Sequence, residues 1–247
     1  MSMEFQDDDE FAGGYIEGDM LPDDSSRNGY PNKKWPFGIL KYVFCGNFTE
    51  AQKDSVRKCC QLLANKTCVR CVETWPLDYG YVCITNDKQG CYSNVGYLNK
   101  WYQDLNLTPT CLENYIVVCH EIIHSLGFTH AHNAYNRDDV YRVNWENIQE
   151  GQEHAFEKRN ETMDCLVPLK KDSAMSYKRL AFSKNGLETL TPLDGNYTQM
   201  GQRTRLTDED IAKINSMYCY NNCTATTNTT TSTTTTTTTT TEATIIA

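Results

Sequence analysis

Histidine is scarce in this chain, and several features that would assign it to a common class of protein are missing. Only five histidines and seven prolines occur among 247 residues. No apolar run is long enough to cross a bilayer, which argues against stable membrane insertion. The opening MSMEFQDDDEF contains no apolar signal-peptide core. Either a signal peptide is missing from this sequence or the chain is not secreted by the usual route, and we favour the first.

Acidic residues are concentrated at the N-terminal end. The formal net charge is −9, and residues 1–27 contain nine acids and one base. Residues 224–247 contain one acid, so residues 28–223 are electrically balanced. A balanced central region presents no basic surface for nucleic acid or anionic lipid, and we expect no nucleic-acid partner.

Composition divides the chain into three zones. Residues 1–27 form an acidic leader that we expect to be poorly ordered on its own. Residues 28–223 contain every cysteine and every histidine and are predicted to form one globular domain. Residues 224–247 form a tail in which 15 of the first 18 residues are threonine. Such a tail cannot bury apolar area, and it predicts an extended, O-glycosylated stalk.

Cysteine number and N-glycosylation sequons indicate an oxidising compartment. The chain has twelve cysteines, an even number that is high for a cytosolic protein. It also has seven N-x-[ST] sequons. Together these features predict a secreted or extracellular glycoprotein with disulfide bonds. The sequons begin at Asn47, Asn65, Asn106, Asn160, Asn196, Asn222 and Asn228.

The pattern of capping residues and short apolar segments predicts an α+β domain. Three helices are expected, each starting at a capping box, and the second should end at Gly127. The capping pairs are Thr49 with Gln52, Thr110 with Glu113, and Thr207 with Asp210. Short strands are expected within residues 67–74, 79–85 and 91–98.

Four of the five histidines lie in the stretch HEIIHSLGFTHAH, which begins at His120. On a helix, His120 and His124 project from one face and can both reach a Zn²⁺ at about 2.0–2.1 Å. Gly127 can turn the chain so that His130 returns as a third ligand. Three protein ligands leave a fourth position open, as in catalytic zinc sites, and Glu121 can contact a metal-bound water there. The alternatives are a structural zinc, which would need four protein ligands, or a helix that is merely histidine-rich.

This stretch and several others resemble a known family. H-E-x-x-H-x-x-G-x-x-H is the signature of the metzincins, and SAMSY, at residues 173–177, resembles their Met-turn with Met175 and Tyr177. The resemblance is specifically to the astacins and covers about residues 28–223. The further stretches that carry it are KKWPFGILKYVF, QGCYSNVGYL, HNAYNRDDVYRVNWENI, KRLAFSKNGLETLTPLD and MGQRTRLTDEDIAKINSMY.

The resemblance implies a fold, a cofactor and a reaction. The fold would have two subdomains: a twisted mixed sheet with the active-site helix, then an irregular subdomain that ends in a helix. One catalytic zinc would act on protein or peptide substrates, with Glu121 as general base. Tyr177 would be a labile zinc ligand that swings towards the substrate oxyanion. YSNVGYL would be the edge strand with which an extended substrate pairs in antiparallel fashion.

The leader resembles an inhibitory propeptide. YIEGDM is similar to the F-x-G-D motif of astacin precursors, with Ile16 in place of phenylalanine. The resemblance implies that the Asp19 carboxylate occupies the open zinc position. A protease that cuts after Arg27 would then activate the enzyme and free Asn28.

One residue departs from the family pattern. Astacins have a glutamate directly after the third histidine that holds the new N-terminus, and here that place is taken by Ala131. His132 or Asp138 is a candidate substitute. We otherwise expect His132 and His154 to be surface histidines.

The resemblance also implies two disulfides, Cys68–Cys223 and Cys91–Cys111. Among the other eight cysteines we expect further disulfides, whose partners the spacing does not assign. Cys119 is expected either to pack in the core or to form one of them. CVRC, at residues 68–71, resembles half a zinc knuckle, but no second C-x-x-C follows at a suitable spacing.

The sequence therefore favours a secreted zinc endopeptidase made as a latent precursor. One alternative is a catalytically inert, extracellular zinc-binding or interaction module with a glycosylated stalk, and Ala131 is the feature in its favour. A second alternative is an extracellular structural protein in which the stalk and its glycans are the functional part.

Overall fold

A computed structural model describes residues 15–21, 33–76, 78–159, 161–164, 167–221 and 224–227, and only the backbone of 161–164 and 224–227. Several sequence predictions lie outside these residues. They are the cleavage site after Arg27, the partners of Cys165 and Cys223, and the threonine run beyond residue 227.

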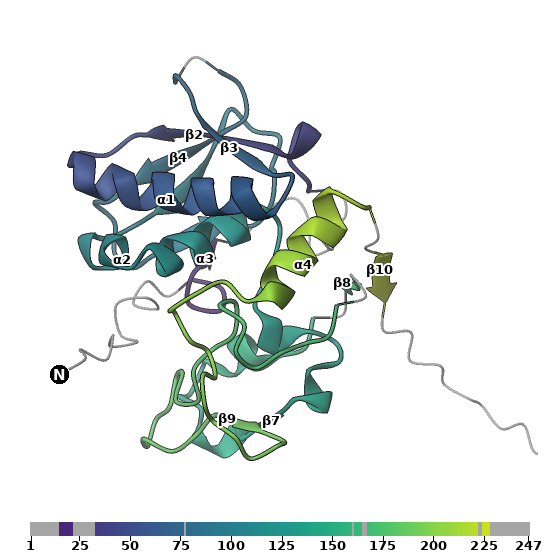
Figure 1. Cartoon of the computed structure of the whole chain (residues 1–247). Coiled ribbons are helices and arrows are strands. Elements are labelled where there is room, and N and C mark those ends of the chain that lie inside the picture. The colour runs from purple at the N-terminus through teal and green to yellow at the C-terminus, as the bar shows by residue number, and fades with distance from the viewer. Residues whose placement is uncertain are drawn as a thin grey trace, which may run out of the picture.

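A six-stranded mixed sheet forms the upper half of the molecule (Figure 1). Its strand order is β1-β5-β6-β4-β2-β3, and β5 runs antiparallel to β6 while all other neighbours are parallel. The strands are β1 (Met20–Leu21), β2 (Ile39–Phe44), β3 (Arg70–Glu73), β4 (Tyr81–Thr85), β5 (Tyr92–Asn94) and β6 (Tyr102–Asn106). The strands expected within 67–74, 79–85 and 91–98 are confirmed as β3, β4 and β5. Leader residues thus add an edge strand, β1, beside β5.

Two of the three predicted capping boxes are present. Thr49 and Gln52 cap α1 (Glu50–Lys66), and Thr207 and Asp210 cap α4 (Asp208–Tyr218). The third prediction, one helix from a Thr110–Glu113 capping box, is wrong. Thr108 instead caps α2 (Pro109–Glu113), and Asn114 leaves helical geometry and caps α3 (Tyr115–Ser125). Pro109 favours this earlier start because proline suits the first turn of a helix.

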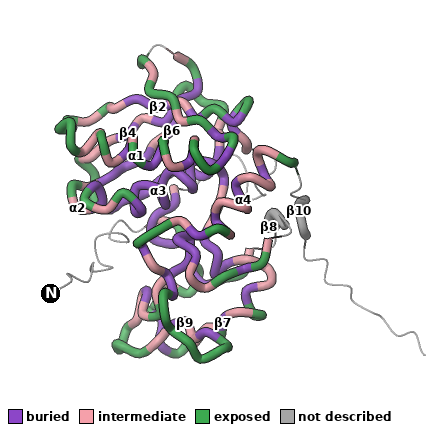
Figure 2. Tube along the Cα trace, viewed as in Figure 1, coloured by how far each residue is buried: buried purple, intermediate pink, exposed green. Residues whose placement is uncertain are grey.

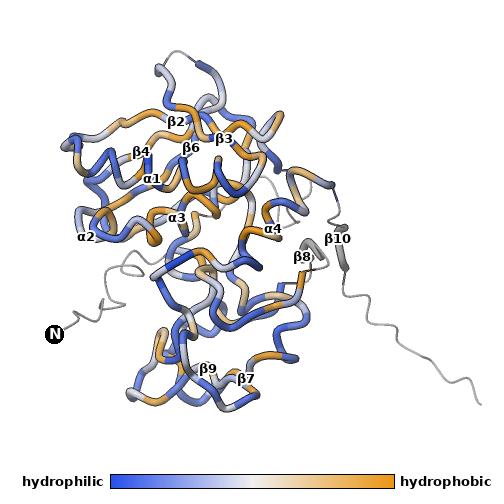
Figure 3. The backbone as a smooth tube through the Cα atoms, in the orientation of Figure 1, coloured by the Kyte–Doolittle hydropathy of each residue, from blue (hydrophilic) through white to orange (hydrophobic). Residues whose placement is uncertain are grey.

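The C-terminal half has little regular structure (Figure 1). Its strands form two separate pairs, β7 (Tyr141–Val143) with β9 (Leu190–Pro192) and β8 (Glu161–Asp164) with β10 (Thr224–Thr227). Figure 3 shows that this half is mostly hydrophilic, whereas the strands and α3 are richer in hydrophobic residues. Short 3-10 helices of this half are at Ala131–Asn133, Arg137–Asp139, Trp145–Asn147 and Glu153–Phe156, and another, at Pro36–Gly38, precedes β2. The α+β class and the two-part arrangement are confirmed. Among the described residues, no helix combines the length and apolarity needed to cross a membrane.

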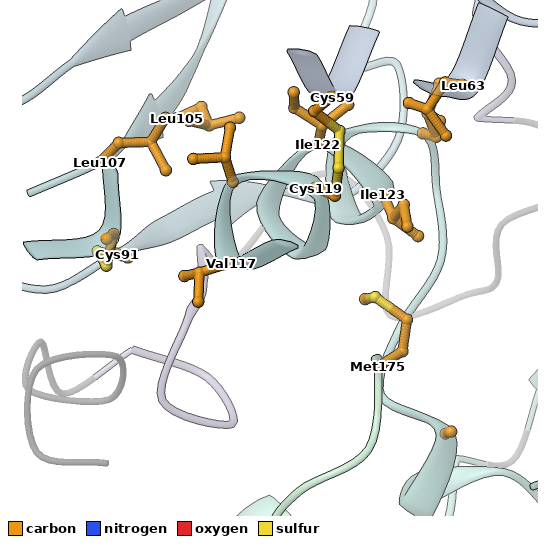
Figure 4. Close-up of a cluster of buried hydrophobic side chains, with 14 of the residues drawn as sticks. Cys59, Leu63, Cys91, Leu105, Leu107, Val117, Cys119, Ile122, Ile123 and Met175 are labelled. Carbon is orange, nitrogen blue, oxygen red and sulfur yellow. A yellow bond between two sulfur atoms is a disulfide. The ribbon is translucent and has the colours of Figure 1, made fainter. Parts of the chain in front are cut away.

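A buried core surrounds α3 and joins the two halves (Figure 2). Every residue of α3 from Ile116 to Ser125 is buried. Figure 4 shows Ile122 and Cys119 facing α1, with Met175 on the opposite side of the helix. The helix that is predicted to bind the metal is therefore enclosed on all sides and held in one position.

Four disulfides are formed among the described residues, and they correct one sequence prediction. Cys91–Cys111 is present, but Cys68 pairs with Cys219 and not with Cys223. Cys219 ends α4, and Asn215 of the same helix donates to the Lys66 carbonyl, so the helix end lies against the turn before β3. The remaining pairs are Cys45–Cys83 and Cys59–Cys119.

The asparagines of the described sequons differ in their exposure to solvent. Asn47, Asn65 and Asn196 are exposed, whereas Asn106 is fully buried in β6 and donates to the carbonyls of Lys88 and Gly90. A glycan can be accommodated at the first three positions, but not at Asn106 in the folded domain.

Candidate metal centre

The metal-binding stretch begins on α3 and continues through a tight turn. His120 and His124 are one helical turn apart, and Gly127 takes a φ of +103° that ends the helix. A Cβ atom at Gly127 would lie 3.2 Å from the Met217 side chain, so a larger residue would also have to shift that side chain. The turn returns His130 to the same point in space as the two helical histidines.

The Nε2 atoms of the three histidines converge with one carboxylate oxygen. Asp19 Oδ2 lies 3.0 Å from His120 Nε2, 3.0 Å from His130 Nε2 and 3.6 Å from His124 Nε2. His120 Nε2 lies 3.0 Å from His124 Nε2 and 3.3 Å from His130 Nε2. All four residues are buried. The structure therefore brings together Asp19 and the three histidines that the sequence singled out.

The opposite ring nitrogens determine which tautomer each histidine adopts. His120 Nδ1 donates to the Ala174 carbonyl at 2.7 Å, and His124 Nδ1 donates to the Phe128 carbonyl at 2.8 Å. His130 Nδ1 donates to Glu17 Oε2 at 2.9 Å. Because each Nδ1 carries a proton, each Nε2 can present a lone pair to the shared point.

This donor set fits zinc. Ligands about 2.0–2.1 Å from a tetrahedral zinc are separated from one another by roughly 3.3 Å. The five separations given above, which run from 3.0 to 3.6 Å, match that spacing. Three neutral imidazoles would hold the ion, and Asp19 takes the fourth position, which a catalytic site leaves for water or substrate.

Burial and nearby charges shift the pKa values of Asp19 and His130 in opposite directions. Burial raises the pKa of Asp19, but the charges of His130 and His124 outweigh it and hold that pKa well below its ordinary value. Burial lowers the pKa of His130, yet Asp19 and Glu17 raise it overall to about 9, so a metal ion would have to displace a proton from this ring in order to bind. The leader carboxylates therefore concentrate negative charge beside His130, where a divalent cation would be bound.

The Met-turn is held by the first turn of α4. Asp210 accepts from the Ser173 hydroxyl at 2.5 Å and from the Ala174 N–H at 3.0 Å, in addition to capping its own helix. The Ala174 carbonyl in turn accepts from His120 Nδ1. The sequence marked Asp210 only as a helix cap, and its link to the metal centre depends on tertiary packing.

Tyr177 and Glu121 are both buried, Glu121 directly after His120 on α3. The Tyr177 hydroxyl donates to the backbone carbonyl of Glu17. Its ring packs on His132 with centroids 3.7 Å apart and on His130 at 4.7 Å. The prediction that His132 lies on the surface is wrong, because the ring is fully buried beside Tyr177 and Phe156.

His132 and Asp138 both interact with other residues of the domain, and the His132 Nε2 atom donates to the Ala155 carbonyl at 3.1 Å. Burial and the charge of His130 hold the pKa of His132 well below its ordinary value, so its ring is neutral. Asp138 forms an exposed ion pair with Lys158. His154 is exposed, as predicted. Whether His132 or Asp138 takes over the task of the glutamate replaced by Ala131 stays a prediction, because Asn28 lies outside the described residues.

The leader segment 15–21 forms a tight reversal beneath α3, the purple loop in Figure 1. Ile16 and Met20 form two backbone hydrogen bonds, and Gly18 between them has a φ of +86° that glycine adopts easily. Beyond the turn, β1 pairs in parallel with β5, and the Ser93 N–H donates to the Asp19 carbonyl. These contacts place the Asp19 side chain at the metal centre.

Glu17 and Arg159 are site residues that sequence reasoning missed. The Glu17 carboxylate is buried, donates nothing, and accepts from both His130 and the Arg159 guanidinium. Glu17 falls at the variable position of the F-x-G-D-like motif. Arg159 is 142 residues away in the chain, so no local pattern connects the two.

Known proteins resemble this chain over most of its length. Low choriolytic enzyme of Oryzias latipes is 34% identical over 215 residues, which cover 82% of this chain and 77% of that protein. Zinc metalloproteinase nas-14 of Caenorhabditis elegans is 37% identical over 192 residues, which cover 76% of this chain but only 38% of that longer protein.

Structure and family comparisons agree with these relatives. The solved structure of high choriolytic enzyme 1, a hatching enzyme zinc-protease from Oryzias latipes, matches with a TM-score of 0.69 and 29% identity. The match covers 80% of this chain and 98% of that one. The model of the astacin family (peptidase family M12A) matches residues 27–219. This chain, with its three-histidine metal centre, therefore belongs to the astacin family of zinc metalloproteases.

Proposed function

We propose that the chain is a zinc-dependent endopeptidase that hydrolyses peptide bonds of protein substrates. The observation that carries this proposal is the convergence of the His120, His124 and His130 Nε2 atoms on one buried point. Zinc bound there would supply Lewis acidity, which acidifies a water molecule and polarises a peptide carbonyl.

The chain's own residues would perform the proton transfers. Glu121, buried beside His120, would take the proton of the attacking water and deliver it to the leaving amine. The Tyr177 hydroxyl would donate a hydrogen bond to the developing oxyanion once the Glu17 carbonyl no longer accepts from it. Both side chains are buried in the folded domain, which supports these proposed roles.

An extended substrate would bind along β5. In the described structure this edge of the sheet is covered by β1 of the leader. When the leader leaves, the backbone groups of Ser93 and its neighbours become available to a new strand. We infer that the substrate backbone pairs there in antiparallel fashion and brings its scissile bond to the metal.

We further propose that residues 1–27 keep the enzyme latent. Three contacts of one short segment support this: Asp19 takes the open metal position, Glu17 accepts from His130, and β1 covers β5. A protease that cuts after Arg27 would disconnect this segment from the catalytic domain. The proposal specifies the activating protease only by its cleavage site, the bond after Arg27.

Secretion is supported by the cysteine pairing. Four disulfides among the described residues are typical of proteins made in an oxidising compartment. We therefore propose an extracellular site of action.

The test of the proposed function is digestion of a general protein substrate by the purified chain, cut after Arg27 and loaded with zinc. We expect cleavage of internal peptide bonds that stops when a chelator removes the metal and returns when zinc is restored. A chain that binds one zinc but cleaves nothing would contradict the proposal. It would favour the inert binding module, and Ala131→Glu would then be the first reversion to examine.

A further inference from the structure

Two thiols in the described part of the chain are not joined to another cysteine. Cys60 is buried and Cys71 is partly buried, whereas the other eight cysteines of the described residues form four disulfides. In a domain with four disulfides, two unbonded cysteines are unexpected, and their redox state requires an explanation.

The two thiols come from different elements and meet at the sheet. Cys60 follows Cys59 on α1, and Cys59 is bonded to Cys119 of α3. Successive side chains on a helix are turned by about 100°, so Cys60 points away from α3. Cys71 lies on β3 and packs against the same hydrophobic core as Cys60. β3 packs against α1, and Cys60 lies close enough to Cys71 to raise the pKa of its thiol.

The surroundings do not suit a metal ion or a reactive nucleophile. The neighbouring Cys60 thiol, together with burial, raises the pKa of the Cys71 thiol well above its ordinary value. A protonated thiol is a poor metal ligand and a poor nucleophile. Tyr42 is close enough for both sulfurs to raise its pKa. Neither cause of the Cys71 shift is a positive charge, which a thiolate needs.

We propose that Cys60 and Cys71 are joined by a fifth disulfide in the secreted protein. The two thiols lose two protons and two electrons and form one S–S bond. A small-molecule disulfide of the glutathione class accepts the electrons and protons and leaves as two thiols. Because the neighbouring Cys60 thiol and burial keep Cys71 protonated, thiol–disulfide exchange in the folded state is slow, and the bond forms while the chain folds.

This bond would complete a covalent path from the edge of the sheet to the metal-bearing helix. Cys60–Cys71 would join β3 to α1, and Cys59–Cys119 joins α1 to α3, one residue before His120. Cys68–Cys219 already ties the start of β3 to the end of α4. The proposal concerns the covalent state of the fold and does not rest on catalytic activity.

Differential alkylation tests the proposal directly on the full chain, folded with reduced and oxidised glutathione. The protein is denatured without reductant and treated with a first alkylating label, then reduced and treated with a second. Mass spectrometry of its peptides reads the label at each cysteine. We expect the second label on both Cys60 and Cys71, as on the control pair Cys91 and Cys111. The first label on either Cys60 or Cys71 would overturn the proposal.

Reciprocal variants establish the pairing. In Cys71→Ala, we expect Cys60 to take the first label while the control pair is unchanged, and in Cys60→Ala we expect Cys71 to do so. A first label on a different cysteine in these variants would show that Cys60 and Cys71 have other partners, and would also overturn the proposal. Where a variant fails to fold, a first label on Cys60 or Cys71 of the unaltered chain still overturns the proposal.

Discussion

The two parts of the metal centre differ in what supports them. His120 and His124 lie on α3, and their Nδ1 atoms donate to backbone carbonyls of Ala174 and Phe128. His130 lies on the loop that follows, and its Nδ1 atom donates to the side chain of Glu17, a leader residue. The helical ligands are therefore positioned by the domain itself, whereas the surroundings of the loop ligand would change if the leader were removed as proposed.

Replacing Glu121 should have the largest effect, because it removes the proposed general base, which lies on α3 next to His120. We expect Glu121→Gln to lower kcat/KM of the cut enzyme by about 10²–10⁴-fold, the usual contribution of a general base. Zinc content should stay unchanged, since all three histidines remain. Kinetic assay and metal analysis check both points, with exposed Glu113→Gln as the matched control. Near-normal activity in Glu121→Gln would contradict the assignment.

Replacing Glu17 tests the contacts that the leader makes with His130, the ligand on the loop. Charge-assisted hydrogen bonds contribute about 1.5–3 kcal/mol each, and Glu17→Gln weakens those to His130 and Arg159. We expect the residual activity of the uncut chain to rise about tenfold, because the leader is held less tightly while Asp19 is intact. Digestion of a protein substrate by the uncut chain measures this rise.

The control for Glu17 is Glu50→Gln, which removes an exposed carboxylate that also forms ion pairs, with Lys53 and Arg57. That variant should leave latency unchanged. Equal residual activity in both variants would show that Glu17 does not hold the leader.

Asp210→Ala should have a smaller effect on the centre, because Asp210 acts on His120 only through Ala174. The change leaves the Ala174 and Thr207 N–H groups without their acceptor, at about 1–3 kcal/mol each. We expect a lower free energy of unfolding and a zinc affinity reduced by up to about tenfold. Denaturant unfolding and zinc titration measure the two effects.

Exposed Asp208→Ala, in the same first turn of α4, is the matched control for Asp210. It changes the helix charge but none of the contacts to the Met-turn. If both variants bind zinc equally well, the proposed link from α4 to His120 is wrong.

Sequence predicted the features that depend on local geometry. The spacing of His120 and His124 and the glycine turn to His130 follow from helical periodicity and backbone sterics, so the ligand set could be predicted. The capping boxes of α1 and α4 were predicted for the same reason. The single helix from Thr110 was not correct, because Asn114 interrupts it and Thr108 with Pro109 provides a better start.

Features that depend on packing between distant segments could not be predicted. Cys219 pairs with Cys68 because α4 ends against the turn before β3, and no spacing rule distinguishes it from Cys223. The burial of His132 beside Tyr177 and the ion pair of Glu17 with Arg159 likewise join residues far apart in the chain. Such contacts become visible only when the two halves are placed together.

The central claim is that the Asp19 carboxylate keeps a complete zinc site closed. The most direct measurement compares digestion of a protein substrate by the uncut chain and by its Asp19→Ala variant, with zinc content determined in both. Asp54→Ala, an exposed change on α1, serves as the control. We predict that Asp19→Ala is active without a cut after Arg27, while the unaltered and Asp54→Ala chains keep only the low residual activity of the uncut chain, and that all three contain one zinc. An Asp19→Ala chain that binds zinc, becomes active when cut and yet remains latent before the cut would contradict the account.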